Sequence, residues 1–104
     1  MSMAEVAFVE DIPNPGAREH YEAVATRLRL REDPPRGLII HAAGPTDGGW
    51  RIVAVWECGE ALARFRDDRL LPAIAEIDDP GRPSTIAFFS VENLISDAPP
   101  NRSD

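Results

Sequence analysis

The residues GLIIHAAGPTDGGWRIVAVWECGEALARFRDDRLLP, positions 37–72, decide the fold of this chain. Alternating apolar residues, a glycine pair and a helical repeat divide them into four predicted elements: a strand over 38–44, a turn over 45–49, a strand over 50–57 and a helix that opens at Cys58 or Gly59. Both strands carry apolar residues on both faces, so the sheet that they form needs a cover on each side. Pro72 predicts a kink in the helix, and Ile74 and Ile77 extend the helix beyond it.

The flanking residues supply three more elements and a tail. In chain order these are a strand over 4–12, a helix that Asn14 caps with Pro15 in its first turn, a strand over 85–95 and a polar, proline-rich tail over 96–104. The first helix presents one apolar face at helical spacing, made by Tyr21, Val24, Ala25 and Leu28. Asp33-Pro34-Pro35 ends that helix. The order strand–helix–strand, repeated once, predicts an α+β, ferredoxin-like antiparallel sheet with two helices on one face. We therefore expect one domain over 1–95 and a disordered tail over 96–104.

The composition excludes several classes of function. The chain has 18 acidic and 11 basic residues and a net charge of −7, so nucleic-acid phosphates and anionic membranes should repel it. Cys58 is the only cysteine, which excludes an intrachain disulfide and zinc sites built from cysteine pairs. The first residues do not read as a signal peptide and no segment reads as a membrane span, so we expect a cytoplasmic protein. The two histidines are far apart, and adjacent acids such as Asp78-Asp79 match no metal motif, so we expect no metal and no cofactor.

The two faces of the central hairpin differ little in polarity. If Gly44 pairs with Trp50, Leu38 lies opposite Trp56 and His41 lies opposite Val53. One face then packs on the helices, while the odd-numbered face still displays apolar residues: Ile39, Val53 and Val55 from the hairpin, and Phe89 and Val91 from the last strand. No element of the chain is left to cover that face, so we expect a homodimer. The alternative is a monomer with an apolar surface.

His41 is the sharpest candidate for chemistry. It lies in the middle of a strand, between Ile40 and Ala42, on the less apolar face. An imidazole can act as a general base or orient a ligand at neutral pH. The alternative is a core or interface histidine that is hydrogen-bonded to a neighbour.

Three aromatic residues are candidates for binding a planar ligand. Trp56 offers a flat apolar wall with a free N–H, and Tyr21 could point its hydroxyl from the first helix into a cavity. Phe65, on the second helix, completes the proposed binding residues. The alternative for Trp56 and Tyr21 is packing in the core. A cavity of several hundred Å3 lined by these residues and His41 would favour a site, whereas filled space would favour a structural role.

The runs G-L-I-I-H-A-A-G (37–44), G-G-W-R-I-V-A-V-W-E (48–57), A-L-A-R-F (61–65) and L-L-P-A-I (70–74) resemble a known family. They are similar to the antibiotic-biosynthesis-monooxygenase-like branch of the dimeric α/β-barrel superfamily. The stretch from Trp56 to Phe65 is its most specific part, and the resemblance covers most of residues 4–95. It implies a ferredoxin-like protomer, a homodimer whose sheets meet face to face as an α/β barrel, and a pocket between sheet and helices. Members include cofactor-independent monooxygenases that act on aromatic, polyketide-like compounds, heme-degrading enzymes and many proteins of unassigned function.

Two functions follow from these observations as expectations. In the first, His41 acts as the base of a cofactor-independent monooxygenase, and Trp56, Tyr21 and Phe65 hold a small aromatic compound. An isomerase or decarboxylase-like step would need the same parts. The heme-degrading members share an asparagine on the first strand and a histidine on the second helix. This chain has neither residue at those places, so heme degradation is not expected. In the second, the chain is a non-catalytic homodimer that binds a small metabolite or serves as a structural module.

Overall fold

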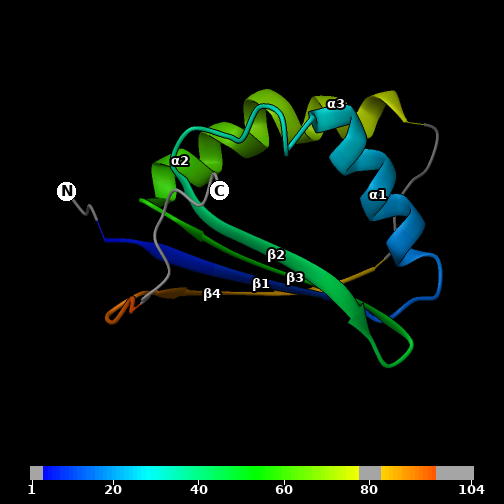
Figure 1. The fold of residues 1–104 in the computed structure, drawn as a ribbon, viewed down its shortest axis with the longest axis horizontal. Coiled ribbons are helices and arrows are strands. Elements are labelled where there is room, and N and C mark those ends of the chain that lie inside the picture. The colour runs from blue at the N-terminus through cyan, green and yellow to red at the C-terminus, as the bar shows by residue number, and fades with distance from the viewer. Residues whose placement is uncertain (1–3, 78–82, 96–104) are drawn as a thin grey trace, which may run out of the picture.

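The computed structural model describes residues 4–77 and 83–95. Its elements follow one another in this order: β1 (Val6–Ile12), α1 (Ala17–Leu28), β2 (Leu38–Thr46), β3 (Gly49–Trp56), α2 (Gly59–Phe65), the π-helical turn η1 (Arg66–Leu70), α3 (Leu71–Glu76) and β4 (Thr85–Ser90). The four strands form one antiparallel sheet in the order β2-β3-β1-β4. Figure 1 shows all the helices on one side of this sheet and none on the other. The predicted α+β, ferredoxin-like fold is therefore confirmed.

The register of the central hairpin differs from the predicted one. Leu38 pairs with Trp56 as expected, but a bulge follows, and from Ile40 onward every pairing is shifted by one residue. His41 therefore lies opposite Ala54 rather than Val53. Because a shift of one residue moves side chains to the other face of a sheet, the bulge carries His41 to the helix-covered face. The prediction that His41 shares a face with Val53 is wrong for this reason.

Paired residues point to the same side of an antiparallel sheet, so the register defines both faces. Three rows of paired residues face the helices: Leu38, Trp56, Val6 and Ser90; His41, Ala54, Phe8 and Phe88; Ala43, Ile52, Glu10 and Ile86. Two apolar rows face the other way: Ile40, Val55, Ala7 and Phe89; Ala42, Val53, Val9 and Ala87. We call this second surface the open sheet face. The prediction of Val53, Val55 and Phe89 on an uncovered face is confirmed, but the bulge places Ile40 there with them.

The first helix is shorter than predicted at both ends. Asn14 does not cap it directly; its side chain accepts a hydrogen bond from the Gly16 amide at 2.9 Å, and the helix begins only at Ala17. This is a turn in which an Asn side chain bonds the backbone two residues on. At the other end Arg29 adopts a left-handed conformation (φ 56°), and the amides of Arg29 and Leu30 donate back to Thr26 and Ala25. The helix therefore ends in a Schellman motif, four residues before Asp33.

The second helix opens at Gly59, with Cys58 as its flanking residue, which confirms the predicted start. The helix passes through the π-helical turn Arg66–Leu70 just before Pro72 and continues as α3 to Glu76. Pro72 lies in the first turn of α3, where its missing N–H is tolerated. The wider π turn accommodates the proline without ending the helical run. Ile74 lies on α3 as predicted, whereas Ile77 follows its end.

The remaining differences concern loops and ends. The hairpin turn is tighter than predicted, because β2 runs to Thr46 and β3 starts at Gly49, with Gly48 at φ 83°. The strand β4 ends at Ser90, so the predicted strand over 85–95 is too long and Val91 follows its end. The predicted polar loop over 78–83 falls mostly, and the tail over 96–104 wholly, outside the described residues. None of the helices in the described ranges has the length and hydropathy of a membrane span.

Candidate functional site

A cavity of about 450 Å3 lies between the helices and the helix-covered face of the sheet. Side chains from β1, β2, β3 and β4 form its floor, and side chains from α1, α2 and α3 form its roof. The lining is mainly apolar, which is typical of sites for small organic molecules. All four residues that the sequence singled out line this one cavity: His41, Tyr21, Trp56 and Phe65. Side chains do not fill the space between these residues, which is the outcome that favours a site over a structural role.

Tyr21 and His41 form the polar centre of the cavity. The Tyr21 hydroxyl and His41 Nε2 are 2.7 Å apart, within hydrogen-bond distance, and their rings lie nearly parallel. Tyr21 reaches down from α1, while His41 rises from the edge strand β2. The buried ring of Trp50, 5.3 Å from that of Tyr21, also packs against the tyrosine. Because the bulge in β2 turns His41 towards the helices, this pair depends on a single irregular residue in the hairpin.

Partial desolvation shifts the pKa of each member of the pair towards its neutral form, although the His41 side chain is still exposed to solvent at the cavity. Desolvation lowers the pKa of the His41 imidazole, so the ring is neutral at neutral pH and Nε2 can accept a proton. Desolvation also raises the pKa of the Tyr21 hydroxyl, and the positive charge of Arg31 opposes that change. A neutral imidazole beside a neutral phenol lets the Tyr21 O–H donate to Nε2 and its oxygen accept a proton from a ligand.

Trp56 and Phe65 form the apolar end of the cavity. Trp56 is only 3% exposed and belongs to a core cluster with Ala54 and Ala61, so it packs in the core and lines the cavity at once. The ring of Phe65, on α2, is 5.2 Å from that of Trp56 in a tilted arrangement. Core packing and a place in the cavity wall, the two alternatives drawn from the sequence for Trp56, are therefore compatible in this structure.

Glu10 is a lining residue that the sequence reasoning missed. It lies on β1, on the helix-covered face, between Ile52 on β3 and Ile86 on β4. Within the described residues its carboxylate has no hydrogen bond or ion pair. A signal was present in the sequence, because Glu10 interrupts an apolar alternation of Val6, Phe8 and Ile12. The cavity therefore offers a ligand one acidic group besides the Tyr21–His41 pair.

No residues can be assigned to a metal in the described ranges 4–77 and 83–95, where no three His, Cys, Asp or Glu side chains form a group that could hold an ion. Cys58 is a free, partly buried thiol at the start of α2 and is not among the residues that line the cavity. The acids Asp67 and Asp68 lie on η1, with the Asp67 carboxylate accepting a hydrogen bond from its neighbour Arg66 at 3.0 Å.

Comparison with solved structures identifies the fold. The chain superposes on SnoaB, a cofactor-independent oxygenase from Streptomyces nogalater, with a TM-score of 0.63 and 22% identity over 88% of this chain and 97% of that one. A proposed antibiotic biosynthesis monooxygenase from Caulobacter crescentus gives a TM-score of 0.68 and 14% identity over 88% and 92%. MhuD from Mycobacterium tuberculosis, a heme-degrader with two hemes bound in its active site, gives 0.62 and 16% over 88% and 99%.

These neighbours confirm the fold that the sequence resemblance implied: the chain has the fold of the antibiotic biosynthesis monooxygenases. No protein-family model and no curated protein sequence matches the chain. At identities of 14–22% the likeness shows the fold alone, because one fold hosts many unrelated functions.

Proposed function

We propose that this chain binds a small, planar, largely apolar aromatic compound in the cavity and oxidises it with molecular oxygen, without a cofactor. The observation that carries the proposal is the hydrogen bond between the Tyr21 hydroxyl and His41 Nε2, at 2.7 Å, inside a mainly apolar cavity. A general base works best when it is neutral at the operating pH and within hydrogen-bond reach of the proton that it takes. The lowered pKa of His41 meets the first condition, and Tyr21 supplies the reach.

The proposed reaction needs one proton transfer and one oxygen molecule. A phenolic hydroxyl of the substrate gives its proton to the Tyr21 oxygen while the Tyr21 O–H passes its own to His41 Nε2. The resulting phenolate carries electron density onto a ring carbon, which reacts with oxygen. One oxygen atom ends as a ring carbonyl and the other leaves as water, so a phenol and one oxygen molecule give a quinone and one water. The protein contributes position and a desolvated environment, with Trp56 and Phe65 stacked against the ring.

The second part of the proposal is a homodimer. The open sheet face carries two rows of apolar side chains, of which Ile40 is 53% and Phe89 57% exposed. A row with Arg51 and Asp11, which form an ion pair, borders them. Large exposed apolar patches on soluble proteins mark interaction sites, and closure by a second copy is the commonest solution. We infer that two chains meet through this face as the halves of an α/β barrel.

A second candidate function is a binding protein that performs no reaction. The unpaired Glu10 carboxylate favours a binding protein. A carboxylate in a mainly apolar wall can select a ligand by accepting one hydrogen bond from it, and the ligand keeps its proton. Binding alone requires the cavity and not the basicity of His41. The two functions therefore differ in what the loss of His41 does.

Oxygen consumption with a panel of hydroquinones and naphthols, measured at an oxygen electrode, tests the proposal. We expect His41→Ala to lower the turnover of any active compound by about 100-fold or more, the usual contribution of a general base, and Tyr21→Phe to lower it less. Thr46→Ala, at the far end of the same strand and outside the cavity lining, serves as the control and should match the unmodified chain. Equal turnover by His41→Ala would refute the role of the pair. Compounds that bind in a calorimeter and are never oxidised would show a binding protein instead.

A further inference from the structure

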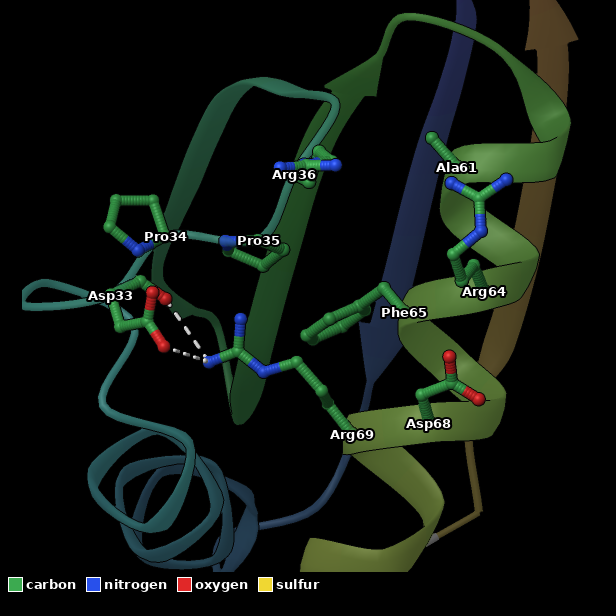
Figure 2. Close-up of a pocket in the computed structure, with 9 residues that line it drawn as sticks. All are labelled: Asp33, Pro34, Pro35, Arg36, Ala61, Arg64, Phe65, Asp68 and Arg69. Atoms are coloured by element: carbon green, nitrogen blue, oxygen red, sulfur yellow. Dashed lines mark hydrogen bonds and ion pairs between the residues drawn. The ribbon is translucent and has the colours of Figure 1, made fainter.

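A second pocket, of about 420 Å3, lies between α2 and the loop that precedes β2. The loop 33–36 forms one wall, and α2 with η1 forms the other (Figure 2). Phe65 lines both this pocket and the cavity described above, so its ring separates the two spaces. We call this space the arginine pocket, because three of its lining residues are Arg36, Arg64 and Arg69. Such a cluster is unusual on a chain with a net charge of −7.

The loop wall is held rigidly against the helix. Pro34 and Pro35 restrict the backbone, and Pro35 is buried. Gly37 has φ 91°, and a Cβ there would lie 2.5 Å from the Cβ of Ala61 on α2, so the loop touches the helix closely. The Gly37 carbonyl accepts a hydrogen bond from the Glu57 amide at 2.8 Å. The backbone at Arg36 is therefore held beside α2 before any ligand arrives.

Two of the three guanidinium groups are unpaired. The guanidinium of Arg69 is already bonded within the protein. Its Nη2 donates hydrogen bonds to the carbonyls of Leu28 at 2.8 Å and Asp33 at 3.1 Å. The same nitrogen lies 3.7 Å from the Asp33 carboxylate, and the dashed lines of Figure 2 mark the contacts with Asp33. Arg36 and Arg64 make no hydrogen bond or ion pair within the described residues, although both are exposed. Asp68 is the other acid of the lining and contacts neither of them by an ion pair in that part of the chain.

The walls between these charges are apolar. Pro34, Pro35, Ala61 and Phe65 line the pocket between the charged residues. A guanidinium presents a planar fork of donors that matches carboxylate and phosphate oxygens, and a rigid frame reduces the entropy lost on binding. We propose that the arginine pocket binds the carboxylate or phosphate group of a small molecule through Arg36 and Arg64, with an apolar or aromatic body lying against Phe65. The proposal does not rest on the oxidation proposed above.

Titration of the 15N-labelled chain, followed by two-dimensional amide spectra, tests this site. The probes are phenyl phosphate, benzoate and inorganic phosphate. We expect phenyl phosphate or benzoate to shift the amides around Arg36, Gly37 and Phe65 in a saturable way. Inorganic phosphate should bind several-fold more weakly, because it lacks the apolar body. The comparison of phenyl phosphate with benzoate decides which anion the pocket prefers.

A matched pair of double variants separates local contact from general electrostatics. R36Q/R64Q should weaken binding of the better probe by about tenfold or more, since it removes two charge-assisted hydrogen-bond donors. R29Q/R31Q makes the same change in net charge just before the loop, on residues outside the pocket lining, and should stay within about twofold of the unmodified chain. Equal weakening by both doubles, shifts confined to other residues, or no saturable shift with any probe would each overturn the proposal.

Discussion

At the scale of single residues, the Tyr21–His41 pair is the feature on which the proposed chemistry depends. Either ring alone would be an ordinary component of an α+β core, but the 2.7 Å contact places a hydroxyl between the imidazole and the cavity. The direction of proton transfer follows from their ionisation. His41 is neutral at neutral pH because burial lowers its pKa, and Tyr21 stays protonated because burial raises its pKa.

The ionisation of His41 gives a direct prediction. In an imidazole titration by two-dimensional NMR, the His41 midpoint should lie below about 6.5, the value of a free imidazole. Spectra of His41→Gln identify the resonance, because only its signals disappear. A midpoint at or above the free value would contradict the desolvation that the structure indicates.

The same depressed pKa affects folding, with a definite sign. In the window between the folded-state pKa and about 6.5, the unfolded chain binds more protons than the folded one, so stability falls as the pH is lowered. Above that window both states are neutral at His41 and the effect vanishes. Urea unfolding at a series of pH values should therefore show a decline on acidification that is smaller in His41→Gln.

At the scale of elements, the close approach of the loop before β2 to α2 depends on a glycine. Gly37→Ala places a Cβ 2.5 Å from that of Ala61 and forces an L side chain into φ 91°, so we expect a loss of about 2–4 kcal/mol in the free energy of unfolding. Gly44→Ala is the matched control, since no atom lies within 4 Å of its Cβ position, and it should be nearly neutral. Equal stability of the two variants in urea unfolding at one protein concentration would contradict the contact.

The elements also show what could be predicted from the sequence. The strands, the start of α2 and the layer order follow from periodicity, because burial on one face imposes periods of two and 3.6 residues. The bulge after Leu38 leaves no such mark, since Ile39 and Ile40 are equally apolar and their pattern does not distinguish one register from the other. The face of His41 was therefore predicted wrongly, although its contact with a cavity was anticipated.

The π turn Arg66–Leu70 was missed for a related reason. Four of its five residues are polar and all of them continue the helical pattern, so nothing in the sequence distinguishes a π turn from an α-helix before Pro72. At the site, the four expected residues share one cavity, whereas Glu10 was overlooked although it interrupts the apolar alternation of its strand. Patterns of apolar residues thus located the cavity and did not assign all of its polar groups.

At the scale of the whole molecule, the sheet divides the chain into a helix-covered side that holds both pockets and an open side that holds none of the described helices. Stable protein–protein interfaces bury about 800 Å2 on each partner, and the two apolar rows of the open sheet face are the surface that we expect such an interface to use. A second copy placed there would meet the side of the sheet opposite to the two pockets.

This arrangement predicts the effect of a charge on the open sheet face. By sedimentation equilibrium at micromolar concentration, the unmodified chain should have twice the 11.4 kDa mass of one protomer, and Val53→Glu should have the mass of one. Val53 lies in the middle of the sheet, on β3 between Ala42 and Val9, so a glutamate there would leave an unpaired charge in the interface. Leu71→Glu, an exposed apolar position on α3, changes the charge equally and should remain a dimer. A monomeric unmodified chain would refute the dimer, and a dimeric Val53→Glu would place the interface elsewhere.

Because both pockets lie on the far side of the sheet, a folded Val53→Glu monomer should still bind phenyl phosphate, which separates assembly from ligand binding.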